Sequence, residues 1–163
     1  MNIIVTVDEN WAIGSRDGEI VKIPAHQRKL QSLSMGKTIV MGKKALQAMP
    51  QAQPLYGREN IILSAEPGLQ IKGARIADSI PSLLKILEGQ PTQDIFVCGG
   101  DSTYRQLFDY CDTAYVTMVE KVYETDRYLV NLDNESDWNL VEESEEQTYF
   151  DITYYFRKYE RVN

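Results

Sequence analysis

The sequence has few of the residues that build metal and disulfide sites: one histidine, His26, and two cysteines, Cys98 and Cys111, in 163 residues. The cysteines have neither metal-ligand spacing nor a CxxC context, so we expect reduced thiols, no metal site and a cytoplasmic location. No run approaches the roughly 18 apolar residues of a membrane span, and no basic stretch precedes a long apolar one near the start. These scarcities argue against a disulfide scaffold, a zinc module and a membrane protein.

Positive charge is also scarce. The formal net charge is −7 and the isoelectric point about 4.8, which argues against a general nucleic-acid or anionic-membrane partner. Local basic residues therefore carry more information in this chain. A length of 163 residues suits a single domain over 1–163 that can enclose a ligand cleft, and we expect a monomer with a small-molecule substrate.

Short apolar runs alternate with helical patterns along most of the chain. Strands are predicted at Asn2–Asp8, Thr38–Met41, Asn60–Leu63, Ala74–Ala77, Ile95–Cys98 and Thr113–Val119, and helices at 24–34, 43–49, 79–88 and 101–108. This alternation indicates βαβ crossovers and a mostly parallel α/β sheet covered on both faces. The end differs: 138–143 and 149–160 alternate polar with apolar residues, which predicts an antiparallel hairpin at the sheet edge with the acidic run 142–146 as its turn.

Three predicted strands end in residues suited to a phosphate-bearing nucleotide. One ends at Gly42, followed by Lys43 and Lys44 in the first turn of a helix, where a bound anion would offset their unfavourable position. Another ends at a Gly-Gly pair, 99–100, that lets a ligand approach the backbone. A third ends at Ser64. Because ligands bind beyond the carboxyl ends of strands in open α/β sheets, the three signals should converge.

The single histidine belongs to the first predicted helix. Pro24 occupies the first turn, where a missing N–H costs nothing. Counting by four and seven from His26 reaches Leu30 and Leu33, so a side chain that titrates near neutral pH shares a face with two leucines. This makes His26 a candidate functional residue. The alternative is a core histidine whose ring is hydrogen-bonded to the backbone.

The motifs together resemble the dihydrofolate reductase family in its short bacterial form, over nearly the full length and without a large gap. The segments that carry the resemblance are Trp11-Ala-Ile-Gly14, Ile23-Pro24, Ile39-Val-Met-Gly42, Pro54-Leu-Tyr-Gly-Arg-Glu-Asn-Ile-Ile-Leu-Ser64, Val97-Cys-Gly-Gly100 with Tyr104, Tyr115-Val-Thr117 and Glu124-Thr-Asp126. The resemblance implies a three-layer sandwich around a mostly parallel eight-stranded sheet. It also implies NADPH as the hydride donor and a folate-like substrate in a cleft beside the first long helix.

The resemblance also implies residue roles. Arg58 lies where the family has the arginine that binds the α-carboxylate of the folate tail, and a guanidinium suits a carboxylate. His26 and Thr117 lie at the catalytic positions. The implied substrate-binding residues are Ile4, Val5, Val21, His26, Leu30, Met49, Arg58 and Thr117. The implied cofactor-binding residues are Thr6, Ile13, Gly14, Gly42, Lys43, Lys44, Ala45, Leu63, Ser64, Cys98, Gly99, Gly100, Asp101, Ser102, Thr103 and Tyr104. Residues 14–22 correspond to the loop that closes over the nicotinamide, with Gly14 and Gly18 as hinges.

The departures from the family concern the pterin side. His26 occupies the position of the family's single acidic residue; a neutral imidazole accepts only one hydrogen bond, and an imidazolium would repel a protonating pterin. Val21 replaces a bulky aromatic residue, Ala45 lacks a common hydroxyl, and Arg127 replaces a threonine. The cofactor elements are therefore better kept than the pterin elements.

The sequence thus predicts NADPH-dependent reduction of dihydrofolate or a close pterin, with altered efficiency, in tetrahydrofolate and one-carbon metabolism. One alternative is a reductase of another heterocycle, such as the pyrimidine of the riboflavin pathway. A substrate without glutamate would have no need of Arg58. The second alternative is a catalytically silent nucleotide-binding protein.

Overall fold

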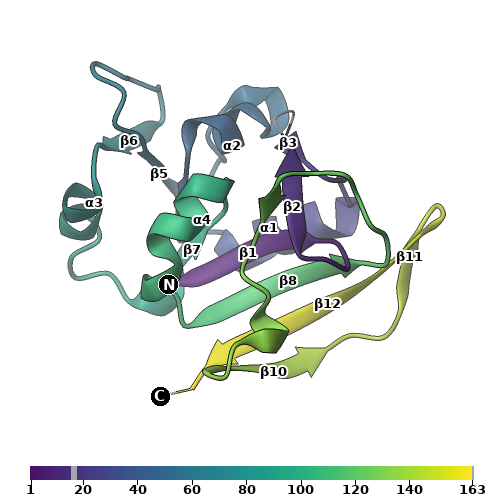
Figure 1. The fold of residues 1–163 in the computed structure, drawn as a ribbon. Coiled ribbons are helices and arrows are strands. Elements are labelled where there is room, and N and C mark those ends of the chain that lie inside the picture. Colours follow the sequence, from purple (N-terminus) through teal and green to yellow (C-terminus); the bar gives the residue numbers. More distant parts are fainter. Residues whose placement is uncertain (16–17, 163) are drawn as a thin grey trace.

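The computed structural model describes residues 1–15 and 18–162 and has a large central sheet. Its strands are β1 (Asn2–Val7), β4 (Thr38–Met41), β5 (Glu59–Leu63), β6 (Ala74–Ala77), β7 (Ile95–Val97), β8 (Thr113–Val119), β10 (Trp138–Glu143), β11 (Gln147–Tyr149) and β12 (Ile152–Arg161). The order is β10-β12-β8-β1-β7-β4-β5-β6, and β11 also pairs with β12 (Figure 1). All neighbours from β8 to β6 are parallel, whereas β12 is antiparallel to β8, β10 and β11. The expected mostly parallel sheet with a C-terminal antiparallel hairpin at its edge is confirmed.

Helices cover both faces of the sheet, which explains the continuous apolar runs of its inner strands. The helices are α1 (Pro24–Ser34), α2 (Lys43–Gln47), α3 (Ile80–Ile86) and α4 (Asp101–Leu107), with short 3₁₀ turns at Pro50–Ala52, Thr92–Asp94, Phe108–Tyr110 and Leu132–Asn134. In β1, Ile3 and Val5 belong to the core cluster that contains residues of α3 and α4, whereas Ile4 belongs to the cluster of α1 and α2. The three-layer α/β architecture is therefore present.

Three helices are shorter than the sequence patterns predicted. α2 ends at Gln47, because Met49 precedes Pro50 and adopts an extended conformation with ψ of 159°. α3 begins after Ser79, whose hydroxyl accepts a hydrogen bond from the Ser82 N–H at 3.1 Å. It ends at Ile86, and α4 ends at Leu107, where the chain tightens into a 3₁₀ turn. These three helices were predicted correctly, and only their ends were wrong.

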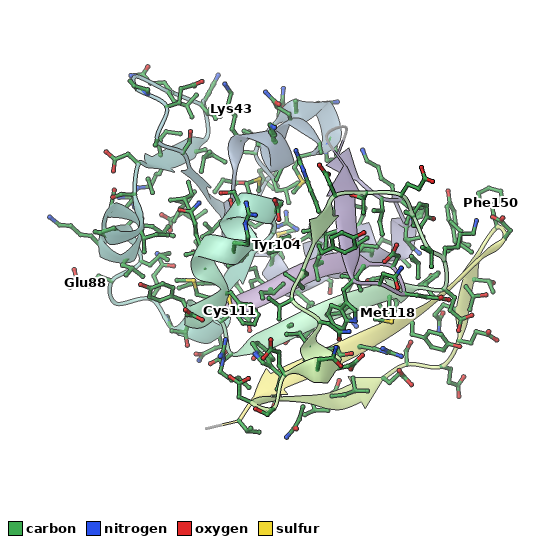
Figure 2. The ribbon with its side chains drawn as sticks, viewed as in Figure 1. Lys43, Glu88, Tyr104, Cys111, Met118 and Phe150 are labelled. Carbon is green, nitrogen blue, oxygen red and sulfur yellow. The ribbon has the colours of Figure 1, made fainter. Side chains whose placement is uncertain are left out.

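The turn of the C-terminal hairpin lies elsewhere than predicted. The acidic run 142–146 includes the end of β10 and leads into β11, and both strands pair with β12. The chain reverses at Phe150 and Asp151, with a positive φ of 55° at Phe150. Phe150 is 86% exposed at the tip of the hairpin (Figure 2). Phenylalanine is unfavourable in this left-handed conformation, so no turn pattern marked the position.

A second, smaller sheet lies beside the first and was not predicted. It has the order β3-β2-β9, with β2 at Ala12–Ser15, β3 at Gly18–Glu19 and β9 at Arg127–Tyr128. Such short strands carry too few residues to show a period of two. The predicted closing loop at 14–22 includes residues 16 and 17, which lie outside the described residues.

A buried carboxylate positions β2 relative to β1. Asp8 follows β1 and is 0% exposed, and its Oδ1 accepts hydrogen bonds from the backbone N–H groups of Asn10 and Ala12 at 2.8 and 2.9 Å. Its Oδ2 accepts from the backbone N–H of Tyr123 at 2.8 Å. One side chain thus ties the turn after β1 to the segment between β8 and β9.

No helix in the described part of the chain is long and apolar enough to cross a membrane.

Candidate active site

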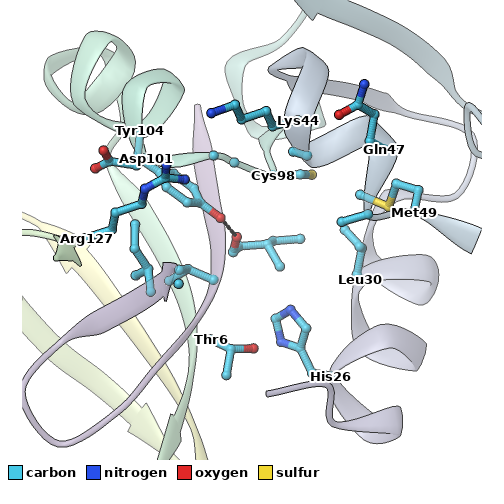
Figure 3. Close-up of a pocket in the computed structure, with 18 of the residues that line it drawn as sticks. Thr6, His26, Leu30, Lys44, Gln47, Met49, Cys98, Asp101, Tyr104 and Arg127 are labelled. Atoms are coloured by element: carbon cyan, nitrogen blue, oxygen red, sulfur yellow. Dashed lines mark hydrogen bonds between the residues drawn. The ribbon is translucent and has the colours of Figure 1, made fainter. Parts of the chain in front are cut away.

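A cavity of about 300 Å³ lies beside the C-terminal half of β1 and the carboxyl end of β7, bordered by α1, α2, α4 and the small sheet (Figure 3). It is lined by Ile4, Val5, Thr6, Ile13, Gly14, His26, Gln27, Leu30, Lys44, Ala45, Gln47, Ala48, Met49, Cys98, Gly99, Gly100, Asp101, Tyr104 and Arg127. Its walls therefore come from six separate segments of the chain. Parallel strands bring these distant segments to one edge of the sheet. Of the three strand ends expected to converge, those followed by Lys44 and by Gly99–Gly100 reach the cavity, and the one followed by Ser64 does not.

His26 forms the floor of this cavity. It lies in the first turn of α1, and its ring is 6% exposed. Nδ1 lies 2.8 Å from Oγ1 of Thr117 on β8, so the partner of the ring is a side-chain hydroxyl and not the backbone. Burial, and to a smaller extent the nearby Lys29 ammonium, lower the pKa of His26 from 6.5 to about 4. The ring is neutral at pH 7.

Two threonines lie side by side beneath the ring. The parallel register of β1 and β8 pairs Thr6 with Thr117, so their side chains point to the same face of the sheet. Thr117 lines a second space of about 10 Å³ below His26, with room for about one water molecule. The Thr6 hydroxyl is buried and has no hydrogen-bond partner among the described residues. The floor thus holds one satisfied and one unsatisfied hydroxyl.

The glycines after β4 and β7 allow the two segments that follow these strands to lie close together. The Gly42 N–H donates to the Gly99 carbonyl at 2.7 Å, and a Cβ on Gly42 would lie 3.0 Å from Oγ1 of Thr103. Gly99 has a φ of +115°, which favours glycine. Space is open above Gly100, where a Cβ would meet nothing within 4 Å. The residues present therefore fit an extended cofactor running over the Gly99–Gly100 backbone.

Charged side chains lie toward the opposite end of the cavity from His26. Figure 3 shows Lys44, Asp101 and Arg127 there. Asp101 pairs with Arg105 at 3.3 Å, and Lys43 pairs with Glu66 at 3.0 Å, away from the cavity lining. With five residues, α2 is too short to contribute much of the helix dipole that the sequence argument invoked. Among the described residues, no cluster of three or more His, Cys, Asp or Glu side chains could hold a metal ion.

Arg58 lies outside the cavity lining, in the segment before β5. Its Nε donates to Ser34 Oγ at 2.9 Å, Nη2 donates to the Gln31 carbonyl at 2.7 Å, and Nη1 donates to the Tyr56 carbonyl. Burial lowers the pKa of Arg58 from its ordinary value, but a guanidinium stays charged at neutral pH. Five N–H groups are available and three are used within the chain, so two remain for a ligand carboxylate.

The structure brings most of the predicted site residues together. Those that line the cavity are Ile4, Val5, Thr6, Ile13, Gly14, His26, Leu30, Lys44, Ala45, Met49, Cys98, Gly99, Gly100, Asp101 and Tyr104. Those that do not are Val21, Gly42, Lys43, Arg58, Leu63, Ser64, Ser102, Thr103 and Thr117. Val21 packs instead against the cluster of Ile23, Val119, Ile152 and Tyr154.

Four lining residues were not predicted: Gln27, Gln47, Ala48 and Arg127. Gln27 neighbours His26 in α1, and the helical pattern around His26 could have suggested it. Gln47 and Ala48 line the cavity because they lie at the C-terminal end of α2, which borders it. Arg127 reaches the cavity through its pairing with Gly14 in the small sheet, which the sequence does not show.

The whole chain is similar to dihydrofolate reductases. The family model described as dihydrofolate reductase matches residues 1–161. The dihydrofolate reductase of Bacillus subtilis (strain 168) is 29% identical over 167 residues, which cover 100% of this chain and 95% of that protein. The dihydrofolate reductase of Staphylococcus haemolyticus is 30% identical over 168 residues, covering 99% and 96%.

A solved structure agrees in fold. Dihydrofolate reductase from Enterococcus faecalis, complexed with NADP(H) and RAB-propyl, superposes with a TM-score of 0.84 at 22% identity, covering 99% of this chain and 96% of that one. The fold, the match of the family model and the position of the cavity are all consistent with the dihydrofolate reductase family. The chain belongs to the dihydrofolate reductase family, a family of NADPH-dependent oxidoreductases.

Proposed function

We propose that this protein catalyses the NADPH-dependent reduction of 7,8-dihydrofolate, or of a close pterin, to the tetrahydro form. The observation that carries the proposal is the cavity whose floor is the buried His26 ring, hydrogen-bonded to Thr117 behind it, and whose lining includes Gly99 and Gly100. A flat ring can lie on this floor. Family membership supports the reaction type.

The cofactor side of the cavity suits a phosphate-bearing dinucleotide. NADPH supplies the hydride in this reaction. Gly100 leaves the backbone open to it, and Lys44 at the cavity edge places a cation where a phosphate would lie. Lys43 would have to leave its ion pair with Glu66 to take part.

The chain's own contribution to the chemistry is positioning and exclusion of water. Ile4, Leu30 and Met49 form an apolar wall beside His26, and an apolar, enclosed site holds reactants in a productive arrangement. The neutral ring of His26 cannot supply the negative charge that a carboxylate would place beside a pterin that is gaining a proton. We therefore propose an efficiency lower than that of enzymes with an acid at this position.

Arg58 supports a substrate with a carboxylate tail. Its two remaining N–H groups can bind a carboxylate at the outer end of α1, near the cavity wall formed by that helix. A reductase for a heterocycle without such a tail would leave this arginine with a structural role only. We further propose a cytoplasmic monomer that has no nucleic-acid or membrane partner, in keeping with the net charge of −7 and the two free cysteines.

The decisive experiment is a spectrophotometric assay of NADPH oxidation with dihydrofolate, run beside a panel of pterins and pyrimidines without a glutamate tail. Turnover of dihydrofolate above that of every tail-free compound is expected. Faster turnover of a tail-free heterocycle would support the alternative reductase. NADPH binding without turnover of any compound would show a catalytically silent nucleotide-binding protein.

A further inference from the structure

The two ring nitrogens of His26 have different environments. Nδ1 faces the Thr117 hydroxyl at 2.8 Å, and Thr117 is 2% exposed and does not line the main cavity. The ring itself lines the cavity and points into it from α1 (Figure 3). Nε2 is therefore the nitrogen that meets a ligand.

The hydrogen bond to Thr117 determines which nitrogen carries the proton. A neutral imidazole has one N–H donor and one acceptor nitrogen, and a threonine hydroxyl has one hydrogen to donate. In the described structure, Nδ1 is the only partner of the Thr117 hydroxyl. If Nδ1 carried the proton, the hydroxyl hydrogen would have no acceptor among the described residues and would need a water molecule in the space of about 10 Å³ beside Thr117. The arrangement that needs no water is Thr117 O–H donating to Nδ1, which leaves the proton on Nε2.

Among the described side chains, no acid lines the cavity beside this N–H group. Beneath the ring are the hydroxyls of Thr6 and Thr117, and the cation of α1 that acts on the ring is Lys29, whose ammonium lies 4.5 Å from the Phe156 ring centroid. The only acid among the described cavity-lining residues is Asp101, which pairs with Arg105.

The remaining charged lining residues, Lys44 and Arg127, are cations. The cavity is thus uncharged at its floor and positive toward its opposite end.

We propose that His26 is a specificity-determining residue: its Nε2–H is a neutral donor that selects a heterocycle offering an acceptor, a carbonyl oxygen or an unprotonated ring nitrogen, and disfavours a protonated, cationic ring. The proposal rests on the proposed function for the class of ligand, a pterin-like heterocycle. It goes further in stating which edge of such a ring the site takes. A carboxylate at this position would have the opposite preference, because it accepts hydrogen bonds and attracts a cation.

The tautomer can be measured directly, because His26 is the only histidine in the chain. Protein labelled with [¹⁵N]histidine should give one pair of ring signals at pH 7, with Nε2 protonated and Nδ1 unprotonated. In Thr117→Val the hydroxyl is lost, and the populations should shift toward a protonated Nδ1. A protonated Nδ1 or an imidazolium in the wild type would overturn the proposal, whether or not the protein turns over dihydrofolate.

The preference can be measured with a matched pair of ligands, 2-amino-4-oxopteridine and the more basic 2,4-diaminopteridine. We expect wild-type protein to bind the oxo compound at least as tightly in calorimetry at pH 7. His26→Asp should shift the ratio of dissociation constants toward the diamino compound by tenfold or more, whereas the neutral control His26→Asn should stay within about threefold of wild type. Tenfold tighter wild-type binding of the diamino compound, or an unchanged ratio in His26→Asp, would refute the proposed preference. Because the readout is binding, a failure of dihydrofolate turnover would be seen separately.

Discussion

The Nδ1 atom of His26 and the Oγ1 atom of Thr117 are 91 residues apart in sequence and 2.8 Å apart in the structure. One belongs to the first turn of α1 and the other to the middle of β8, and β1 runs beside β8 beneath the helix. The ring is therefore held by the packing of a helix on the sheet. Its charge and its tautomer depend on the core and not on solvent.

The buried ring should make stability depend on pH. Its pKa is about 4 in the folded protein and about 6.5 when unfolded, so between these values the unfolded state binds more protons. Above pH 6.5 the ring has no effect on the free energy of unfolding. As the pH falls from 6.5 to 4, the free energy of unfolding should fall by up to about 3 kcal/mol. Urea unfolding at pH 7 and pH 4 should show this loss in wild type relative to His26→Gln. The same loss in both proteins would contradict the low pKa.

The unsatisfied hydroxyl of Thr6 should cost stability. Val has nearly the shape of Thr and suits the centre of a strand, so Thr6→Val removes a buried hydroxyl without opening a cavity. We expect the free energy of unfolding to rise by about 1 kcal/mol. Thr117→Val is the matched control on the neighbouring strand, and it should destabilise because the Thr117 hydroxyl has a partner. Loss of stability in Thr6→Val would indicate that its hydroxyl binds a water or ligand.

The alternation of apolar runs and helical patterns was enough to predict the parallel sheet, because inner strands such as β1 and β4 are apolar on both faces. The position of the Gly-Gly pair in the cavity also followed from a strand end, whereas His26 was a candidate because of its helix face and the family resemblance. The position of Arg127 in the cavity could not be predicted. It depends on strand pairing between segments more than 100 residues apart, and two-residue strands have no detectable period. The helical pattern predicted that His26 shares a face with Leu30 and Leu33, but only the family resemblance placed Thr117 with it at the catalytic positions.

Lys44 should contribute more than Lys43 to cofactor preference. We expect the protein to bind NADPH at least tenfold more tightly than NADH, because the added phosphate is attracted to these lysines. Lys44 lines the cavity, whereas Lys43 is held by Glu66 at 3.0 Å. Lys44→Ala should therefore reduce the ratio of dissociation constants more than Lys43→Ala. Equal affinities for the two cofactors in the wild type would exclude both lysines from a phosphate site.

Arg58 should affect substrate binding and not cofactor binding. Arg58→Leu is expected to raise KM for dihydrofolate about tenfold with little change in the dissociation constant of NADPH, since binding common to ground and transition states is lost. Arg58→Lys keeps the charge but lacks the planar fork, so it should recover only part of the loss. Because Arg58 also ties Ser34 and Gln31 to the segment before β5, each variant needs a thermal unfolding curve as a control. An unchanged KM would favour a substrate without a carboxylate tail.

Replacing the neutral ring by an acid should improve catalysis of dihydrofolate reduction. At pH 7 a ring with a pKa of about 4 carries almost no positive charge, so wild-type turnover should rise toward acid, where imidazolium or solvent supplies the proton. His26→Asp restores a hydrogen-bond acceptor in the first turn of α1. It should raise kcat/KM at pH 7 by tenfold or more, which corresponds to about 1.4 kcal/mol of transition-state stabilisation. His26→Asn, which stays neutral, should show no such gain. If wild type is already fast at pH 7 and His26→Asp is no faster, the imidazole itself must act as the proton donor, and its neutral state must change when the substrate binds.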